Sequence, residues 1–432
     1  MHPADIAEIM KDLEFEEAEF IYKNLGEEKA SGILVHIEEE MRERILGSLS
    51  SKEIAEDLDG LESDDAADVI SELPPEQKEE VISHLEDKEQ KSDIVNLLSY
   101  AEGTAGSLMA KELIRVNHNW TVLKCVKEMR RQVEEIKTVY SVYVVDDNNI
   151  LLGLLSLKRM LVSPAENKIS DIYNPNIISV KTSTLSEEVA QIIEKYDIVV
   201  VPVVDEEGHL MGRITIDDVV DVIRKEETED IHKMGGMQAL EDSYSSTSVY
   251  SMVKKRGLWL MILFAGEGLT ATAMAFFEDQ LAKAVVLAFF VPLIISSGGN
   301  TGSQATTLIT RALALNEIST NDWWKVLKKE VLSGFFLGLG LGLLGFVRVF
   351  IWSSFVNIYG DHWALIGITV FISLMGVVMW GNIMGAILPL FLKRMGLDPA
   401  VSSAPFVATL VDVTGIIIYF VTATFMLKGI LL

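Results

Sequence analysis

The chain has 432 residues, with 63 Asp and Glu against 37 Lys and Arg and a formal net charge of −26. Residues 253–432 hold 12 basic and 9 acidic residues, so the negative charge lies in residues 1–252. A region this acidic repels nucleic acid and attracts cations, which excludes nucleic acid as a partner. The single cysteine, Cys125, excludes a disulfide framework and a CxxC metal site.

Residues 1–103 are predicted to form short amphipathic helices. Apolar residues recur at three- and four-residue spacing, as in Ile6, Ile9 and Leu13. Ser63-Asp64-Asp65 predicts the start of a helix, and Leu73-Pro74-Pro75-Glu76 predicts a stop followed by a new helix. Such helices bury a core only when they stack, so we expect an acidic helical superhelix here.

Residues 104–227 contain an internal repeat. One copy includes Tyr143–Asp147 and Gly153–Leu161, and the other includes Pro202–Glu206 and Gly212–Val220. Each copy predicts a strand, an acidic turn, a second strand and then a helix. The repeat resembles a tandem pair of CBS domains, the first at residues 104–167 and the second at 168–227. This resemblance implies a module that senses adenine nucleotides or ions.

Gly212, Thr215 and Asp218 form a Gly-x-x-Thr-x-x-Asp pattern in the second copy. The pattern resembles the ribose-phosphate corner of nucleotide-binding CBS domains, so ATP is a candidate ligand. The first copy has Arg159 where the acid would stand, which leaves the second copy as the candidate site. The alternative interpretation is a turn with a purely structural role.

Residues 228–256 are predicted to form a connecting segment, with a helix on either side of a loop at 235–248. Residues 257–432 are predicted to form a pore domain with five membrane-spanning helices. The predicted spans are Gly257–Phe277, Leu281–Ser297, Val331–Trp352, Trp363–Leu392 and Ala400–Leu427. The predicted fold class is a multi-domain α and α/β membrane protein, with an N-terminal helical superhelix, a tandem CBS pair, a connecting helix and a five-helix transmembrane domain.

Basic residues orient the predicted spans. Lys and Arg gather before the first span, between the second and third, and between the fourth and fifth, whereas the opposite loops carry Glu278-Asp279 and Asp361. The start of the chain shows neither the basic region nor the apolar region of a signal peptide. We therefore expect a multi-pass protein of the plasma (inner) membrane, with its N terminus in the cytoplasm and its C terminus outside.

Asp412 lies inside the last predicted span. A carboxylate at membrane depth is costly and indicates an ion path; the alternative is an acid that only holds the helices together. Ser402, Pro405, Thr409 and Asp412 are spaced 3, 4 and 3 residues apart, which predicts one polar stripe on a helix. One carboxylate is a weak site for a divalent ion, so we expect a homodimer with two such acids facing each other across a two-fold axis.

The segment Pro292–Gln304 contains Ser-Ser-Gly-Gly-Asn-Thr-Gly-Ser-Gln and predicts a break in the second membrane helix. Irregular backbone at membrane depth must be buried in protein or line a watery cavity. Free carbonyls and the Asn300 amide are therefore expected to face a hydrated cation, and a turn that serves only packing is the alternative. Overlapping GxxxG steps at Gly334, Gly338 and Gly342 indicate helix packing.

Acidic residues surround the entry to the connecting segment. They are Asp217, Asp218, Asp221, Glu226, Glu229 and Asp230. The first two are spaced to share a helical face with Asp221, where like charges repel unless a cation bridges them. A solvated acidic face is the alternative interpretation.

Taken in order, these pieces resemble the MgtE family of magnesium channels. The resemblance is carried by Thr104–Met109, Asp218–Ile223, Thr228–His232, the glycine-rich segment and Asp412. It implies a homodimer in a lipid bilayer, with hydrated Mg²⁺ bound at Asp412 and a further acid, Asp398, at the pore mouth. It also implies regulatory Mg²⁺ sites at Asp218, Asp221, Glu226, Glu229 and Asp230, with Asp64, Asp65 and Asp68 as the helical-domain acids that face the CBS pair.

These features predict a Mg²⁺-selective, Mg²⁺-gated channel for magnesium uptake, not an enzyme, in which cytoplasmic Mg²⁺ closes the pore. The alternative is an ion-coupled carrier of Mg²⁺, Co²⁺ or Mn²⁺, with Asp412 and Glu267 as a proton relay. We expect Glu267 to line the path or to pair with Arg348 or Asn382. A CBS-regulated anion channel would need a basic lining, and a non-transporting sensor would have no use for Asp412.

Overall fold

The computed structural model describes residues 1–132, 139–240, 244, 247–356 and 359–431. The chain divides into two compact units, Met1–Glu226 and Glu227–Leu432. Helix α13 (Ile216–Met234) crosses the boundary between them. The predicted limit between the second CBS copy and the connecting segment, after residue 227, therefore falls inside a helix.

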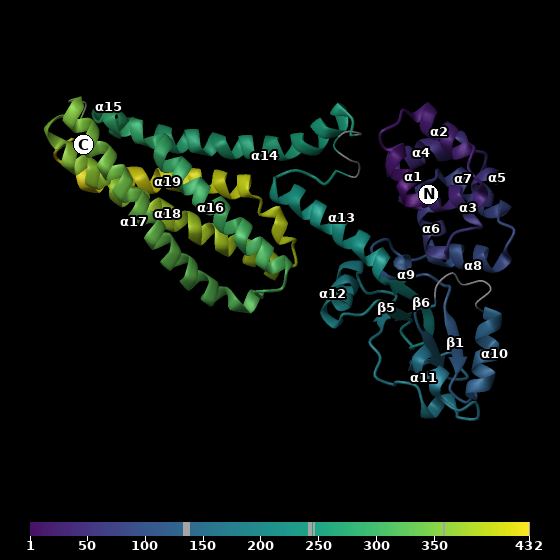
Figure 1. The fold of residues 1–432 in the computed structure, drawn as a ribbon. Helices are drawn as coiled ribbons and strands as arrows, with labels where there is room; N and C mark the ends of the chain where they lie inside the picture. Colours follow the sequence, from purple (N-terminus) through teal and green to yellow (C-terminus); the bar gives the residue numbers. More distant parts are fainter. Residues whose placement is uncertain (133–138, 241–243, 245–246, 357–358, 432) are drawn as a thin grey trace. The chain divides into compact units, whose positions relative to one another are not determined.

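Short helices build the N-terminal part of the first unit (Figure 1). They are α1 (Pro3–Met10), α2 (Phe15–Lys23), α3 (Glu27–His36), α4 (Glu39–Ser48), α5 (Ser51–Leu58), α6 (Ser63–Glu72), α7 (Pro75–His84) and α8 (Lys88–Leu97). The predicted start at Ser63 and the predicted restart at the double proline are confirmed. Proline is tolerated in a first helical turn, where its missing N–H would have no partner in any case. Helix α1 packs on α3, α5 on α7 and α6 on α8.

The repeat forms two three-stranded sheets with the same topology. The strands are β1 (Ile114–Asn117), β2 (Val142–Val145) and β3 (Leu151–Leu155), then β4 (Val180–Lys181), β5 (Val200–Val204) and β6 (Leu210–Thr215). In each sheet the first two strands are parallel and the last two are antiparallel. The hairpins were predicted, but β1 and β4 were not, because strands this short carry too little alternation to be seen. The described residues of the pair also form α9 (Ala105–Leu108), α10 (Val122–Gln132), α11 (Leu157–Val162), α12 (Ser186–Tyr196) and the start of α13.

One apolar core joins the N-terminal helices to the second CBS copy. It includes Ile33, Ile54 and Ile70 from the helices and Val203 and Ile214 from the second sheet, all fully buried. The first copy has a separate core. Because α6 and the second sheet share one core, the acids of α6 are held in a fixed position beside the start of α13.

Five segments of the second unit are long and apolar enough to cross a membrane, as predicted. They are α14 (Val249–Phe276), η3 (Val285–Phe290) continued by α16 (Val291–Ala314), α17 (Trp323–Phe355), α18 (Trp363–Arg394) and α19 (Ala404–Leu427). A loop separates α13 from α14, as predicted, although residues 241–243 and 245–246 of that loop lie outside the described residues. The short helices α15 (Glu278–Lys283) and η6 (Pro399–Val401) precede the second and fifth segments.

The glycine-rich segment is helical, and the predicted break at Pro292–Gln304 is wrong. Helix α16 runs unbroken through it, and the irregular part comes earlier, as the 3₁₀ helix η3. The second membrane segment is therefore Val285–Ala314 rather than Leu281–Ser297. The glycines allow close packing instead: a Cβ on Gly381 of α18 would lie 2.5 Å from the carbonyl O of Gly298. Small residues let membrane helices approach this closely while each helix keeps its backbone hydrogen bonds.

Two further features hold the membrane helices together. The GxxxG steps of α17 pack against α18 as predicted, since a Cβ on Gly338 would lie 3.0 Å from Met375 Cα. Pro389 lies inside α18 and cannot donate to the carbonyl of Gly385 one turn earlier. Thr306 Oγ1 of α16 donates to that carbonyl at 3.1 Å, so the freed acceptor has a partner between the helices.

Candidate cation path and sensor residues

Asp412 of α19 faces α16 across a cavity of about 430 Å³. The other residues that line this cavity are Val291, Pro292, Ile295, Ser296, Gly299, Asn300 and Ala408. A Cβ on Gly299 would lie 3.2 Å from Asp412 Oδ1, so the glycine leaves room for the carboxylate against α16. An acid that opens onto a cavity of this size is suited to a hydrated cation, because Mg²⁺ is usually bound through one or two carboxylates with several waters kept.

Asn300 lines the same cavity, where it was predicted to lie. Its Nδ2 donates to Ser296 Oγ, one helical turn earlier, at 3.3 Å. Because this part of α16 is an intact helix, its carbonyls are used inside the helix. The polar groups that α16 presents to the cavity are therefore the side chains of Ser296 and Asn300. The expectation that free backbone carbonyls would line it is wrong.

The predicted polar stripe along the last helix is only partly present. Ser402 precedes α19, and its Oγ donates to the carbonyl of Pro399 at 2.6 Å. Thr409 is turned toward α14, since a Cβ on Gly266 would lie 2.5 Å from Thr409 Cγ2. The spacing argument assumed a helix from Ala400, but Ser403 caps α19 and the helix starts only at the residue after it. On this helix the cavity is lined by Ala408 and Asp412.

Asp398, predicted at the pore mouth, lies just before α19 and is half-buried. Its Oδ1 accepts from the Ala400 N–H at 2.8 Å and caps η6. Its Oδ2 accepts from Lys233 Nζ at 2.7 Å, and the same ammonium lies 2.6 Å from Glu229 Oε1. Partial burial alone would lower the pKa of Lys233, but the hydrogen bonds to Asp398 and Glu229 outweigh it and raise the pKa above its ordinary value.

Within the first unit, the charge of Asp218 acts on two other predicted regulatory acids. Asp64 and Asp68 lie on α6, and Asp218 lies in the first turn of α13. Burial, and next the charge of Asp218, raise the pKa of Asp64 well above its ordinary value. The same two causes raise the pKa of Asp68 to about 6, although this side chain keeps contact with solvent. Like charges held this close attract a cation, which relieves the repulsion.

The pKa of Asp218 is also raised, by a different set of causes. Burial raises the pKa of Asp218 to about 6, and the charges of Asp217 and Glu62 add to the shift. Hydrogen bonds from Thr215 oppose it, because they favour the ionised carboxylate. The net shift shows that crowding with other acids and removal from water outweigh the local hydrogen bonds.

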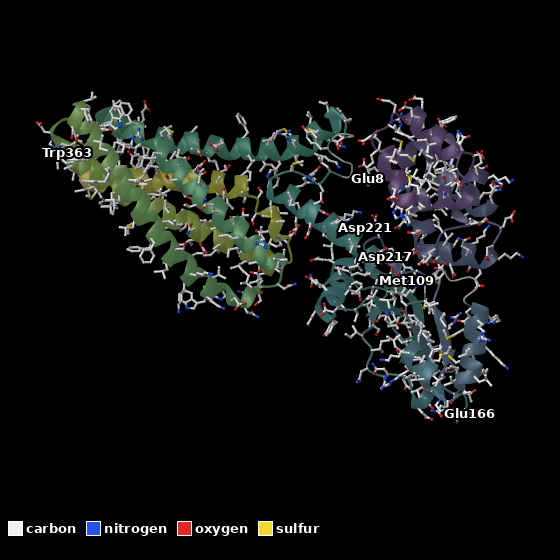
Figure 2. All side chains as sticks on the ribbon, in the orientation of Figure 1. Glu8, Met109, Glu166, Asp217, Asp221 and Trp363 are labelled. Carbon is white, nitrogen blue, oxygen red and sulfur yellow. The ribbon has the colours of Figure 1, made fainter. Side chains whose placement is uncertain are left out.

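The other predicted regulatory acids lie in different surroundings. Asp65 is half-buried, and its N–H donates to Asp64 Oδ1 at 2.9 Å. Asp217 and Asp221 are both exposed along α13 (Figure 2), and Asp221 lies 3.7 Å from Arg224. The half-buried acids further along the same helix are Glu226, Glu229 and Asp230. The face that Asp217, Asp218 and Asp221 were predicted to share is therefore divided, and of these three only Asp218 is half-buried.

Asp64 also belongs to a second group of acids, whose other members, Glu62 and Glu112, the sequence reasoning missed. Carboxylate oxygens of Glu62, Asp64 and Glu112 all lie within 4.8 Å of one another. Glu112 accepts from the N–H of Ser63 at 3.0 Å and from its Oγ at 2.9 Å. Glu62 pairs with the buried Arg213 at 2.9 Å. These partners are far apart in the chain, so no local motif marks them, and they fix the helical domain to both CBS copies.

The Gly212, Thr215 and Asp218 corner sits where β6 ends and α13 begins. Thr215 donates to Asp218 Oδ2 from its N–H at 3.1 Å and from its Oγ1 at 2.7 Å. A Cβ on Gly212 would lie 2.7 Å from the carbonyl O of Ala110. All three residues thus have structural roles in this conformation, and nucleotide binding here stays a prediction.

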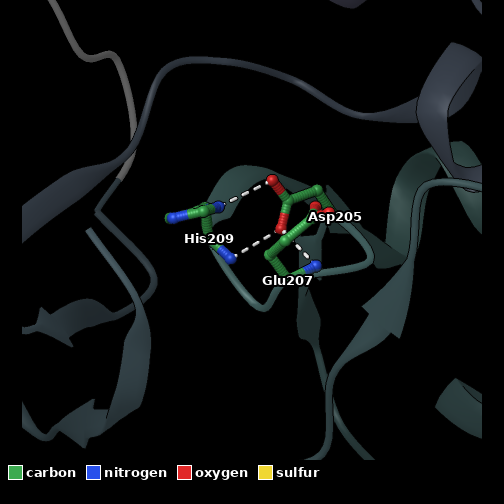
Figure 3. A group of neighbouring side chains, drawn as sticks. All are labelled: Asp205, Glu207 and His209. Carbon is green, nitrogen blue, oxygen red and sulfur yellow. Dashed lines mark hydrogen bonds and ion pairs between the residues drawn. The ribbon is translucent and has the colours of Figure 1, made fainter. Parts of the chain in front are cut away.

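Another compact group, formed by Asp205, Glu207 and His209, lies in the turn between β5 and β6 (Figure 3). Asp205 Oδ1 accepts from the N–H of Glu207 at 3.1 Å and from that of His209 at 2.7 Å. Its Oδ2 lies 2.8 Å from His209 Nδ1. These hydrogen bonds close the hairpin turn and account for the cluster, so we assign no ion to it.

An acidic helical domain, a CBS pair and five membrane-length helices, with an acid that lines a cavity between two of them, define a membrane transport protein. The sequence pattern of the divalent cation transporter family MgtE matches residues 291–422. The MgtE intracellular N domain matches residues 1–103, and CBS domains match 105–165 and 169–225.

Individual relatives agree with these patterns. The magnesium transporter MgtE of Thermus thermophilus is 39% identical over 80% of this chain and 74% of its own length. That of Enterococcus faecalis is 33% identical over 79% and 73%. The crystal structure of the cytosolic domain of the Mg²⁺ channel MgtE in complex with ATP is 34% identical, with a TM-score of 0.49 over 51% of this chain and 90% of that one. The chain belongs to the MgtE family.

Proposed function

We propose that this protein is a Mg²⁺-selective channel for magnesium uptake that closes when cytoplasmic Mg²⁺ rises. The observation that carries the proposal is the carboxylate of Asp412, which lines a cavity between two membrane-length helices. Relatives that are named magnesium transporters, at 39% and 33% identity, support it. We propose no enzymatic activity for the chain.

The ion would be held through its water shell. Mg²⁺ gives up water reluctantly, so a carboxylate usually binds it with several waters kept. Ser296 and Asn300 would meet those waters from the α16 side of the cavity. Because one chain supplies one Asp412, we propose a homodimer in the lipid bilayer whose two copies of Asp412 face the same ion across a two-fold axis.

The acids of the first unit would sense the same ion. Asp64, Asp68 and Asp218 fit a divalent cation, because they come from two domains and the charge of Asp218 raises the pKa of both Asp64 and Asp68. Mg²⁺ bound between them would favour the arrangement in which α6 and α13 lie close together, and this would shift the population toward the closed channel. Further regulatory Mg²⁺ is proposed at Asp65 and at the acids of α13, namely Asp221, Glu226, Glu229 and Asp230.

The proposed location follows from the charges that flank the helices. Lys and Arg cluster on the side of the acidic domains, and this supports an N terminus in the cytoplasm and a C terminus outside the plasma (inner) membrane. ATP is proposed as a ligand of the second CBS copy at Gly212, Thr215 and Asp218. In the present conformation it would have to compete with the Thr215–Asp218 hydrogen bonds.

Ion flux into liposomes that carry the purified protein tests the proposal. Mg²⁺, Ca²⁺, Mn²⁺ and Na⁺ are supplied one at a time, and uptake is followed with an indicator or tracer for each. We expect Mg²⁺ uptake to exceed that of the other ions and to follow an imposed voltage. Absence of Mg²⁺ uptake by folded protein would contradict the proposed function.

One observation favours a second candidate, a proton-coupled carrier. Glu267 of α14 is close enough to Asp412 for the two acids to interact electrostatically, so the pair offers two carboxyls for one proton. The alternative pairing of Glu267 with Asn382 is not seen, since the Asn382 amide lies 3.3 Å from Glu330 Oε2. Mg²⁺ uptake that requires a proton gradient, with no response to voltage alone, would favour the carrier.

A further inference from the structure

We propose that the ammonium of Lys233 is a tethered cation that occupies the mouth carboxylate Asp398 and thereby holds the channel entrance closed. This inference rests on the proposed Mg²⁺ channel function and adds a residue to it. Lys233 lies in the last turn of α13, whereas Asp398 follows 165 residues later, directly before the helix that carries Asp412.

Both carboxylate oxygens of Asp398 already have hydrogen-bond partners. Its Oδ1 caps η6 through the Ala400 N–H, and its Oδ2 holds Lys233 Nζ at 2.7 Å. A hydrated Mg²⁺ that approaches this carboxylate would meet a positive charge already in place. The ammonium and the ion therefore compete for the same group.

Glu229 makes this competition selective for a divalent ion. Its Oε1 lies 2.6 Å from the same Lys233 nitrogen, so two carboxylates converge on one positive charge. When the ammonium leaves, Glu229 and Asp398 face each other as like charges, which a divalent cation neutralises better than a monovalent one. In the closed state the ammonium therefore takes the place that an ion passing through the pore would occupy between these two carboxylates.

A separate set of contacts packs the residues that follow Lys233 against the start of α19. Gly236, two residues beyond α13, has φ +73°, and a Cβ there would lie 2.5 Å from Trp259 Nε1. Trp259 Nε1 donates to Ser403 Oγ at 3.1 Å, and Ser403 is the capping residue of α19. The Trp259 ring also packs against Phe406, with ring centroids 6.2 Å apart. The lysine is therefore brought to Asp398 by a docked segment, which distinguishes it from a mobile surface lysine.

Helix α13 carries Asp218 in its first turn and Lys233 in its last. A change sensed at Asp218 would reach Lys233 along one element of the chain. The closed channel would then be the state in which Lys233 is bound to Asp398, and opening would require the ammonium to withdraw.

Mg²⁺ currents in membrane patches with the cytoplasmic face exposed test this directly. Lys233→Met removes the charge and keeps the apolar stem, and Lys233→Arg keeps the charge. Lys254→Met is the matched control, because Lys254 is exposed. We expect the cytoplasmic Mg²⁺ concentration for half-closure to rise about fivefold in Lys233→Met, the change expected for loss of one partly exposed ion pair. Lys233→Arg and Lys254→Met should behave like the wild type.

A double-mutant cycle separates the tether from a general structural role of Lys233. Asp398→Asn should raise the half-closing concentration on its own, and Lys233→Met should add little to it, because both remove the same contact. Unchanged closure in Lys233→Met, or fully additive effects in the double variant, would overturn the tether while the channel function stands. If the wild type conducts Mg²⁺ but never closes, both the role of Lys233 and the proposed gating by Mg²⁺ are wrong. If the wild type carries no Mg²⁺ at all, the proposed function is wrong as well.

Discussion

Carboxylates are crowded in the first part of the chain and sparse in the membrane helices. Of the 63 acidic residues, 54 precede residue 253, whereas Asp412 is the acid on the cavity between α16 and α19. In the first unit the charge of Asp218 raises the pKa of both Asp64 and Asp68, so one acid changes the properties of its neighbours. Among the residues that the structure describes, Asp412 is the acid that lines this cavity, and Glu267 of α14 acts on it electrostatically. The difference supports the proposal that sensing involves several acids together, while conduction depends mainly on Asp412.

Removal of the membrane acid should have the largest effect. Loss of a charged ligand worth about 3 kcal/mol would lower Mg²⁺ uptake in liposomes about 100-fold in Asp412→Ala. Asp361→Ala, which removes an exposed loop acid, is the control and should keep wild-type uptake. Normal uptake by a folded Asp412→Ala dimer would show that the path lies elsewhere.

A substitution that disturbs the packing between α16 and α18 should have the second-largest effect, here on stability. In Gly381→Ala the added methyl group would lie 2.5 Å from the Gly298 carbonyl O, and overpacking of this kind costs about 1–3 kcal/mol. Gly340→Ala is the matched control, because nothing lies within 4 Å of its Cβ position. Thermal unfolding in detergent should show a lower midpoint for Gly381→Ala alone. Equal midpoints would mean that α16 and α18 pack less closely than described.

Removing the charge of a single sensor acid should have a moderate effect on stability, and the size of this effect depends on pH. The pKa of Asp218 is raised to about 6 from its ordinary 3.8, so the folded protein disfavours the charged form. The resulting cost to stability is fully present above about pH 6 and fades as the pH falls toward 4. In Mg²⁺-free buffer at pH 7.5 we expect Asp218→Asn to stabilise the folded protein by about 1 kcal/mol, a value discounted for solvent screening.

Chemical denaturation of the full chain at several pH values measures this gain. It should vanish near pH 4 and shrink when Mg²⁺ is added, because protons and Mg²⁺ relieve the same repulsion. Asp217→Asn, at the exposed neighbour, is the control and should change stability less. A destabilised Asp218→Asn at pH 7.5 would argue that Asp218 is held by favourable contacts.

The smallest effect is expected for Asp221→Asn. Its side chain is exposed and lies 3.7 Å from Arg224, and surface changes of this kind alter stability by no more than about 0.5 kcal/mol. We also expect Mg²⁺ to protect the region around α13 from protease. Asp221→Asn should weaken this protection less than Asp218→Asn does. If Asp221→Asn removed the protection and Asp218→Asn did not, the sensor would lie further along α13 than proposed.

Local patterns predicted much of the fold, and contacts between distant segments explain the errors. Hydropathy located five membrane segments, and the double proline marked the start of α7. The glycine-rich segment was misjudged because glycine spacing does not distinguish a broken helix from one packed closely against a partner, here Gly381 of α18.

The candidate site shows the same limit. Asp412 was singled out as a carboxylate inside an apolar run, where polar groups are expensive. Asn300 was proposed from a predicted helix break that is not present, although it does line the cavity. Lys233 was missed because its partner Asp398 is 165 residues away, although its i,i+4 spacing from Glu229 was visible. Glu112 was missed for the same reason, since it contacts Ser63 from 49 residues away.

The most direct test of the account measures Mg²⁺ current against cytoplasmic Mg²⁺ for the wild type and Asp218→Asn. If conduction depends on Asp412 and sensing on the crowded acids, both proteins should carry equal current at low cytoplasmic Mg²⁺. The wild-type current should then fall steeply as Mg²⁺ rises, whereas the Asp218→Asn current should depend on it much less. Identical closing curves for the two proteins, or loss of current in Asp218→Asn at low Mg²⁺, would contradict the separation of sensor and path.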